Sequence, residues 1–128
     1  MNRKELELII SDNYGAEADY PWAKYPNYAV FRHDSNKKWF AIIMSVPKNK
    51  LWLEETDNLD VVNFKCEPVL IGSLRKENGF FSAYHMNKEN WITVALDGSV
   101  ADEKIKMLLD MSYNATLPKV KKKWECEF

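Results

Sequence analysis

The fold of this chain is decided by residues 83–94, which read Ala-Tyr-His-Met-Asn-Lys-Glu-Asn-Trp-Ile-Thr-Val. Apolar residues flank the polar centre of this stretch on both sides: Phe80, Phe81, Ile92, Val94 and Leu96. Two short apolar runs around a polar centre are typical of two strands joined by a loop. We therefore expect a hairpin or loop that carries His85, Asn87 and Lys88 between two antiparallel strands.

The composition is that of a globular domain. The chain has 128 residues, of which 46% are hydrophobic and 29% charged, and this length suits one domain with a real core. Eighteen basic and nineteen acidic side chains give a net charge of −1, which argues against a strongly basic nucleic-acid binder but allows a local basic face. The charged amino terminus and the absence of a long apolar run predict a cytoplasmic monomer that does not enter a membrane.

Apolar spacing predicts the elements of the first half. A helix is expected over Arg3 to Tyr14, because Leu6, Ile9, Ile10 and Tyr14 form a stripe at helical spacing. Gly15 stands where such a helix would end. Strands are expected over residues 28–32 and 39–46, joined by the turn residues 34–37, and a third over 61–65.

The second half continues the pattern. A helix is expected to begin at Pro68, with strands over residues 80–84 and 91–96 and a last helix that is capped by Ser99 and runs to about Asn114. The buried side of the Pro68 helix is assigned to Val69, Leu70, Ile71 and Leu74. Short connections make consecutive strands antiparallel, so we predict an α+β fold, an antiparallel sheet with helices packed on it. The predicted core joins Leu6, Ile9 and Ile10 to Phe31, Ile42 and Val94.

Several segments resemble the MmcQ/YjbR-like family of small bacterial proteins, which have a double-wing, CyaY-like fold. The matching segments are residues 15–21, 29–32, 65–68 (Lys-Cys-Glu-Pro), 84–88 (Tyr-His-Met-Asn-Lys) with Trp91, Thr93 and Val94, and 109–113. The departures are Ala83 in place of a glycine and Asn90 where a histidine is common. The resemblance implies a two-layer domain of order α-β(3)-α-β(2)-α over residues 1–117, followed by a basic C-terminal tail over 118–128.

The resemblance also implies a function, because the family is commonly labelled DNA-binding through the likeness of its sheet to a double-wing motif. It brings no catalytic residues and no cofactor, so we expect a non-enzymatic domain. Binding to duplex DNA would be weak, sequence-independent and made through phosphates. An alternative is a protein-interaction adaptor that offers a sheet face or edge to a protein partner. The candidate nucleic-acid-binding residues are Lys65, Arg75, Lys76, His85, Asn87 and Lys88, with the tail lysines 119–123 as a further basic segment.

A third hypothesis is an enzyme that uses Tyr84, His85 and Cys66, and it requires these side chains to converge on one pocket. His85 is more often a hydrogen-bonded loop corner than a base, and Cys66 is more often a buried thiol than a reactive thiolate. The histidines and cysteines, His33, His85, Cys66 and Cys126, are scattered without the close pairs of a zinc site. We therefore expect no metal.

Overall fold

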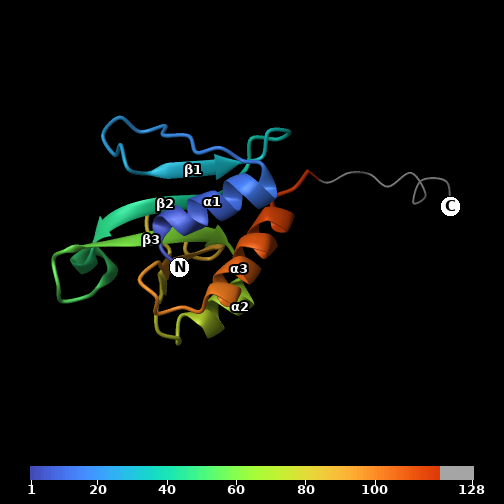
Figure 1. The fold of residues 1–128 in the computed structure, drawn as a ribbon. Coiled ribbons are helices and arrows are strands. Elements are labelled where there is room, and N and C mark those ends of the chain that lie inside the picture. Colours follow the sequence, from blue (N-terminus) through green and yellow to red (C-terminus); the bar gives the residue numbers. More distant parts are fainter. Residues whose placement is uncertain (119–128) are drawn as a thin grey trace.

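The computed structural model describes residues 1–118, so the tail lysines 119–123 lie outside the described residues. The order α-β(3)-α-β(2)-α is confirmed (Figure 1). The elements are α1 (Arg3–Tyr14), β1 (Ala29–Arg32), β2 (Trp39–Pro47), the short 3-10 helix η1 (Lys48–Leu51), β3 (Asn58–Lys65), α2 (Pro68–Leu74), β4 (Phe80–Ser82), β5 (Trp91–Ala95) and α3 (Asp102–Ala115).

The strands form one antiparallel sheet of five strands in the order β1-β2-β3-β5-β4. Strand β3 is the centre of this sheet, since it pairs with β2 through Ala41 and Phe64 and with β5 through Val62 and Val94. Helix α2 connects β3 to the edge strand β4, and β5 then returns to lie between them. The residues 83–90 connect β4 to β5, as the opening motif predicts.

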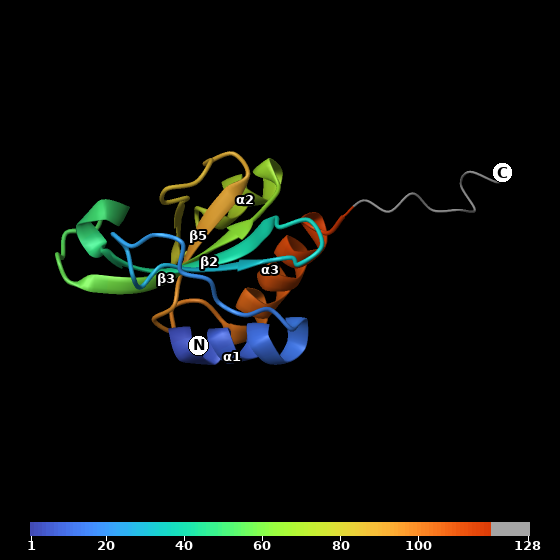
Figure 2. The same ribbon diagram turned by 90° about the horizontal axis from the view of Figure 1, so that it is seen from above.

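The three α-helices of the described chain all contribute to a core on one face of the sheet. Figure 2 shows α1 and α3 on the same side of β2 and β3. The helices supply Leu6, Ile10, Ile71, Leu74, Ile105, Leu108 and Leu109, and the strands supply Phe31, Phe40, Ile43, Val62, Phe64, Ile92 and Val94. Phe31 and Val94 belong to this core together with Leu6 and Ile10, as predicted, whereas Ile9 is only partly buried against it. We call the side of the sheet that packs against the helices the helix-covered face.

The prediction for Ile42 is half right. Its side chain is buried, with 2% exposed, but it belongs to a second cluster on the opposite face of the sheet. Side chains alternate along a strand, so Ile43 on the helix-covered face forces Ile42 to the other side. We call the side that holds Val30, Ile42, Met44 and Val61 the loop-covered face.

Loops, rather than α-helices, cover this second face. The segment before β1 brings Trp22 and Tyr28, the η1 turn brings Leu51, and the connection between β4 and β5 brings Ala83 and Tyr84. Loops close a sheet less completely than a helix does, because they present no continuous apolar stripe. This face is therefore where a pocket can form.

Two local predictions are wrong. Val69 is 87% exposed, because Ile71 and Leu74 take the buried side of the seven-residue α2. Ser99 does not cap α3, which begins at Asp102 after Ala101. The Ser99 backbone N–H and hydroxyl instead donate to the Asp97 carboxylate at 3.0 and 2.6 Å. Within residues 1–118, no helix combines the length and apolar character needed to cross a membrane.

Candidate ligand-binding site on the loop-covered face

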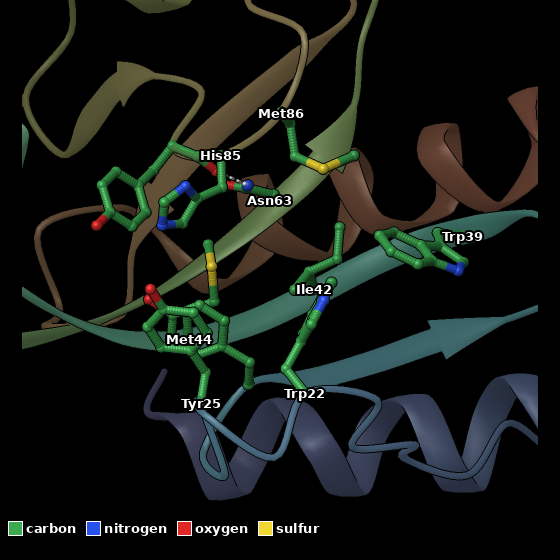
Figure 3. A pocket seen from close by; sticks show the side chains of 10 residues that line it. Trp22, Tyr25, Trp39, Ile42, Met44, Asn63, His85 and Met86 are labelled. Atoms are coloured by element: carbon green, nitrogen blue, oxygen red, sulfur yellow. Dashed lines mark hydrogen bonds between the residues drawn. The ribbon is translucent and has the colours of Figure 1, made fainter.

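A pocket of about 340 Å³ opens on the loop-covered face, and we call it the aromatic pocket (Figure 3). Its side chains come from the segment before β1, from the floor strands β2 and β3, and from the connection between β4 and β5. The lining residues are Trp22, Tyr25, Tyr28, Trp39, Ile42, Met44, Asn63, Tyr84, His85 and Met86. These ten side chains include no carboxylate and no ammonium group, so the pocket suits a neutral, flat or apolar group.

The aromatic walls support one another. Trp22 meets Trp39 edge to face, with ring centroids 5.5 Å apart, and meets Tyr28 in the same way at 6.1 Å. Tyr25 stacks on Tyr28 at 4.6 Å with the planes only 11° apart. Offset-stacked and edge-to-face arrangements are the favoured geometries of aromatic pairs. The walls are thus held by contacts between themselves before any ligand binds.

A buried hydrogen-bond network attaches the 83–90 connection to the floor of the pocket. Asn63 is completely buried on β3, and its Nδ2 donates to the Tyr84 carbonyl at 2.8 Å. The Thr93 hydroxyl donates to Asn63 Oδ1 at 2.5 Å and accepts from the Tyr84 backbone N–H at 2.9 Å. The sequence analysis missed Asn63, although an amide inside the apolar run Val61-Val62-Asn63-Phe64 is a signal of such a partner.

Local hydrogen bonds hold the rest of this connection. Lys88 Nζ donates to the Ala83 carbonyl at 2.9 Å, and Asn87 Oδ1 accepts from the Glu89 backbone N–H at 2.8 Å. The backbone of Cys66 then donates to the Asn90 carbonyl at 2.8 Å, which joins the end of β3 to the end of the loop. Asn87 and Lys88 thus shape the loop through local hydrogen bonds, whereas the His85 side chain makes none within residues 1–118, so the expected hydrogen-bonded corner at His85 is not found.

His85 sits at the rim of the pocket, exposed, with its backbone in the left-handed region at φ 61°. Its ring lies 4.0 Å from that of Tyr84 and 6.2 Å from that of Tyr25. Burial is the main cause that raises the pKa of Tyr28 to about 12, so this phenol stays neutral at physiological pH.

A second, positively charged groove lies beside the pocket. It has a volume of about 300 Å³ and is lined by Lys38, Trp39, Lys65, Trp91, Ala115 and Thr116. Lys65 Nζ lies 5.7 Å from the centroid of the Trp91 ring, within the range of a cation–π contact. We call it the lysine groove. Trp39 lines both the groove and the aromatic pocket.

The predicted nucleic-acid-binding residues fall into two groups. Lys65, His85, Asn87 and Lys88 lie at or near the connection between β4 and β5, at the end of the sheet where β5 begins. Arg75 and Lys76 are exposed beyond the end of α2. That segment leads to Gly79, whose carbonyl bonds the backbone of Ala95 at the other end of β5. Strand β5 thus separates the two groups.

The three residues of the enzyme hypothesis do not share a pocket. Tyr84 and His85 line the aromatic pocket, whereas Cys66 is buried in the cluster of the helix-covered face. Burial also raises the pKa of the Cys66 thiol, which disfavours a reactive thiolate. In the described part of the chain, no three His, Cys, Asp or Glu side chains gather as a metal ion would require.

Comparison with known proteins agrees with the motifs and with the fold. A family model described as YjbR matches residues 12–115. This chain belongs to the YjbR family. The uncharacterized Bacillus subtilis protein YyaQ is 39% identical over 116 residues, which cover 91% of this chain and 98% of YyaQ. The uncharacterized Escherichia coli protein YjbR is 37% identical over 75 residues, 56% of this chain and 64% of that protein.

Solved structures of relatives share the architecture. The crystal structure of a Pseudomonas syringae protein superposes with a TM-score of 0.90 at 43% identity, covering 91% of this chain and all of that one. A Deinococcus radiodurans protein at 22% identity has a TM-score of 0.71, over 98% of this chain and 86% of its own. The likeness to the Deinococcus radiodurans protein concerns the fold alone. The family and the α+β fold expected from the motifs are therefore confirmed.

Proposed function

We propose that this member of the YjbR family is a non-enzymatic binding module that binds nucleic acid weakly and without sequence preference, through the loop-covered face of its sheet. The observation that carries this proposal is the position of Trp39, which lines both an aromatic pocket without carboxylate or ammonium side chains and a groove with two lysines. Aromatic rings beside ammonium groups are the recurring elements of sequence-tolerant nucleic-acid surfaces.

The charges predict the character of this binding. Lysine acts toward phosphate as a point charge, so contacts through Lys38 and Lys65 weaken as salt rises. The net charge of −1 supplies no long-range attraction. We therefore expect dissociation constants in the non-specific range, roughly 10⁻⁴–10⁻⁶ M.

Fluorescence anisotropy with two unrelated DNA duplexes, each at two salt concentrations, tests the proposal. We expect similar affinities for both duplexes and weaker binding at the higher salt. Lys38→Ala and Lys65→Ala, which remove the two ammonium groups of the lysine groove, should both weaken binding, whereas Lys106→Ala, an exposed lysine on α3, is the matched control. Undetectable binding of both duplexes and of their separated strands at low salt would refute the proposal, and tight binding to only one duplex would refute its lack of sequence preference.

A specific observation also favours the second candidate, a protein-interaction adaptor. Trp52, next to η1 in the connection between β2 and β3, is 93% exposed, with its backbone in the left-handed region at φ 66°. Tryptophan is enriched among residues that dominate protein interfaces. Capture of a protein partner is compared between the parent protein, Trp52→Ala and the control Tyr20→Ala. A partner that the parent and Tyr20→Ala both retain, and that Trp52→Ala loses, would support the adaptor. A strict monomer that retains no partner would count against it.

A further inference from the structure

We infer that the aromatic pocket and the lysine groove together form a subsite for one unpaired nucleotide, whose base packs in the pocket and whose phosphate binds between Lys38 and Lys65. This inference rests on the proposed nucleic-acid function and gives it a chemical form. It makes single strands, rather than duplexes, the preferred ligand of this face.

The sheet places the two cavities side by side, with Trp39 common to the lining of both. Asn63 and Lys65 lie two residues apart on β3, so both project from the loop-covered face, Asn63 toward the pocket and Lys65 toward the groove. Strand pairing places Trp91 opposite Lys65, and Trp39 spans the boundary between the two cavities. A flat group and an anionic group that are linked within one small ligand can therefore reach both at once.

Charge complementarity selects the class of ligand. The ten side chains of the pocket carry neither a carboxylate nor an ammonium group, while the groove lining includes two ammonium groups and no carboxylate. The complementary ligand has a neutral, planar part and a negative part. A nucleobase with its phosphate has this composition, and every base offers a face for stacking on an aromatic ring.

The site requires the base to be unpaired. Within a duplex, both faces of a base are covered by its neighbours, and extruding it costs a few kcal/mol. The pocket walls, in contrast, support one another through the Trp22–Trp39 and Tyr25–Tyr28 contacts and are tied to β3 by the hydrogen bond of Asn63. A preformed wall favours a ligand whose base is free to enter.

Three fluorescently labelled DNA probes of equal length test this inference: a single strand, the same strand with abasic sites, and its duplex. We expect the single strand to bind at least about five-fold more tightly than the abasic strand, since stacking on an aromatic ring is worth about 1–3 kcal/mol per base. Trp22→Ala should abolish this difference. Lys65→Ala should weaken binding of intact and abasic strands alike and lower the salt slope by about one. Trp52→Ala, which removes an exposed tryptophan outside both cavities, should change neither result.

These experiments distinguish a failure of the nucleotide subsite from a failure of nucleic-acid binding as a whole. Equal binding of intact and abasic strands, or a duplex that binds as tightly as the single strand, would overturn the subsite and leave the proposed function standing. No binding to any of the three probes, together with no binding of a nucleoside monophosphate, would overturn both. Titration with a nucleoside monophosphate, with inorganic phosphate as its control, distinguishes the source: saturation by the monophosphate without strand binding would assign the subsite to a free nucleotide.

A thermal melt checks that each variant is folded. If Trp22→Ala fails to fold, Tyr25→Ala replaces it, because Tyr25 lies at the rim with 37% of its surface exposed. Loss of the preference for intact strands with Tyr25→Ala supports the subsite, and an unchanged preference refutes it.

Discussion

The buried amide of Asn63, near the end of β3, donates a 2.8 Å hydrogen bond to the backbone carbonyl of Tyr84, at the start of the 83–90 connection. These residues are 21 positions apart in the sequence. The bond joins the floor of the aromatic pocket to its wall. Thr93 completes the network from β5, so three segments share one polar cluster inside an otherwise apolar face.

Replacing Asn63 by alanine should destabilise the protein and loosen the pocket. The change leaves the Tyr84 carbonyl and the Thr93 hydroxyl without their partner, and a buried unpaired polar group costs about 1–3 kcal/mol. Urea denaturation measures the loss. The matched change Thr93→Val and the double variant should show non-additive losses, because both residues belong to one network. Additive losses would show that the two side chains act independently.

Ile42→Ala should lower the free energy of unfolding by about 2–5 kcal/mol, since it empties a buried site in β2. Val69→Ala, at a residue 87% exposed on α2, is the control and should cost less than about 0.5 kcal/mol. Chemical denaturation of both variants measures the difference. A small loss for Ile42→Ala would mean that the loop-covered face is not a packed core.

Gly79→Ala should be destabilising by at least about 1 kcal/mol, because the backbone there is in the left-handed region at φ 88°. An added Cβ would also lie 2.5 Å from Ser99 Oγ and 2.6 Å from a Val100 methyl group. Gly72→Ala, inside α2 with no atom within 4 Å of the added carbon, should instead stabilise by about 0.5–1 kcal/mol. Differential scanning calorimetry compares the two, and equal melting temperatures would contradict the strain at Gly79.

His33 should make stability depend on pH. Burial is the main cause that lowers the pKa of this histidine below its ordinary value of 6.5, and its Nε2 lies 2.9 Å from Thr116 Oγ1 and 3.1 Å from the Tyr113 carbonyl. The unfolded chain takes up a proton near pH 6.5 and the folded chain does not, so stability falls as the pH decreases below about 6.5. Urea midpoints between about pH 7.5 and 5.5 measure this effect. His33→Gln should make the stability depend less on pH over this range. If the slope of stability against pH is unchanged, other titrating groups cause the dependence.

His85→Gln should leave the fold intact, because the exposed His85 ring lies at the pocket rim and the loop is held by Asn63, Lys88 and Asn87. Amide NMR signals should shift only in the 83–90 connection and in the facing segment around Tyr25. Loss of the dispersed spectrum would show instead that the histidine is part of the core.

The local elements follow from the sequence with good accuracy. The bounds of α1 agree with the prediction, and Gly15 ends it in the left-handed conformation. The failures occur where neighbours compete: Asp97 takes the Ser99 hydroxyl that was expected to cap α3, and Ile71 and Leu74 take the buried side from Val69. Such competition is settled by packing that no single segment contains.

The candidate site was less accessible to sequence reasoning. The Tyr-His-Met-Asn-Lys motif marks one wall of the aromatic pocket, and Lys65 was recognised as a candidate. Trp22, Trp39 and Asn63 were not, because they are distant in sequence. The β2–β3 pairing brings Trp39 and Asn63 to the pocket, and the segment before β1 brings Trp22. An aromatic residue in a strand is equally consistent with core packing and with a pocket wall.

The sequence alone determined the α+β class, the order of the elements and the family, because periodicity and motifs are local properties of the chain. The tertiary structure decided which face each strand residue occupies and that loops rather than helices cover the second face. It also brought an aromatic pocket without carboxylate or ammonium side chains and a pair of lysines together at Trp39. Such a meeting depends on strand register, which contacts between distant residues establish and no local pattern encodes.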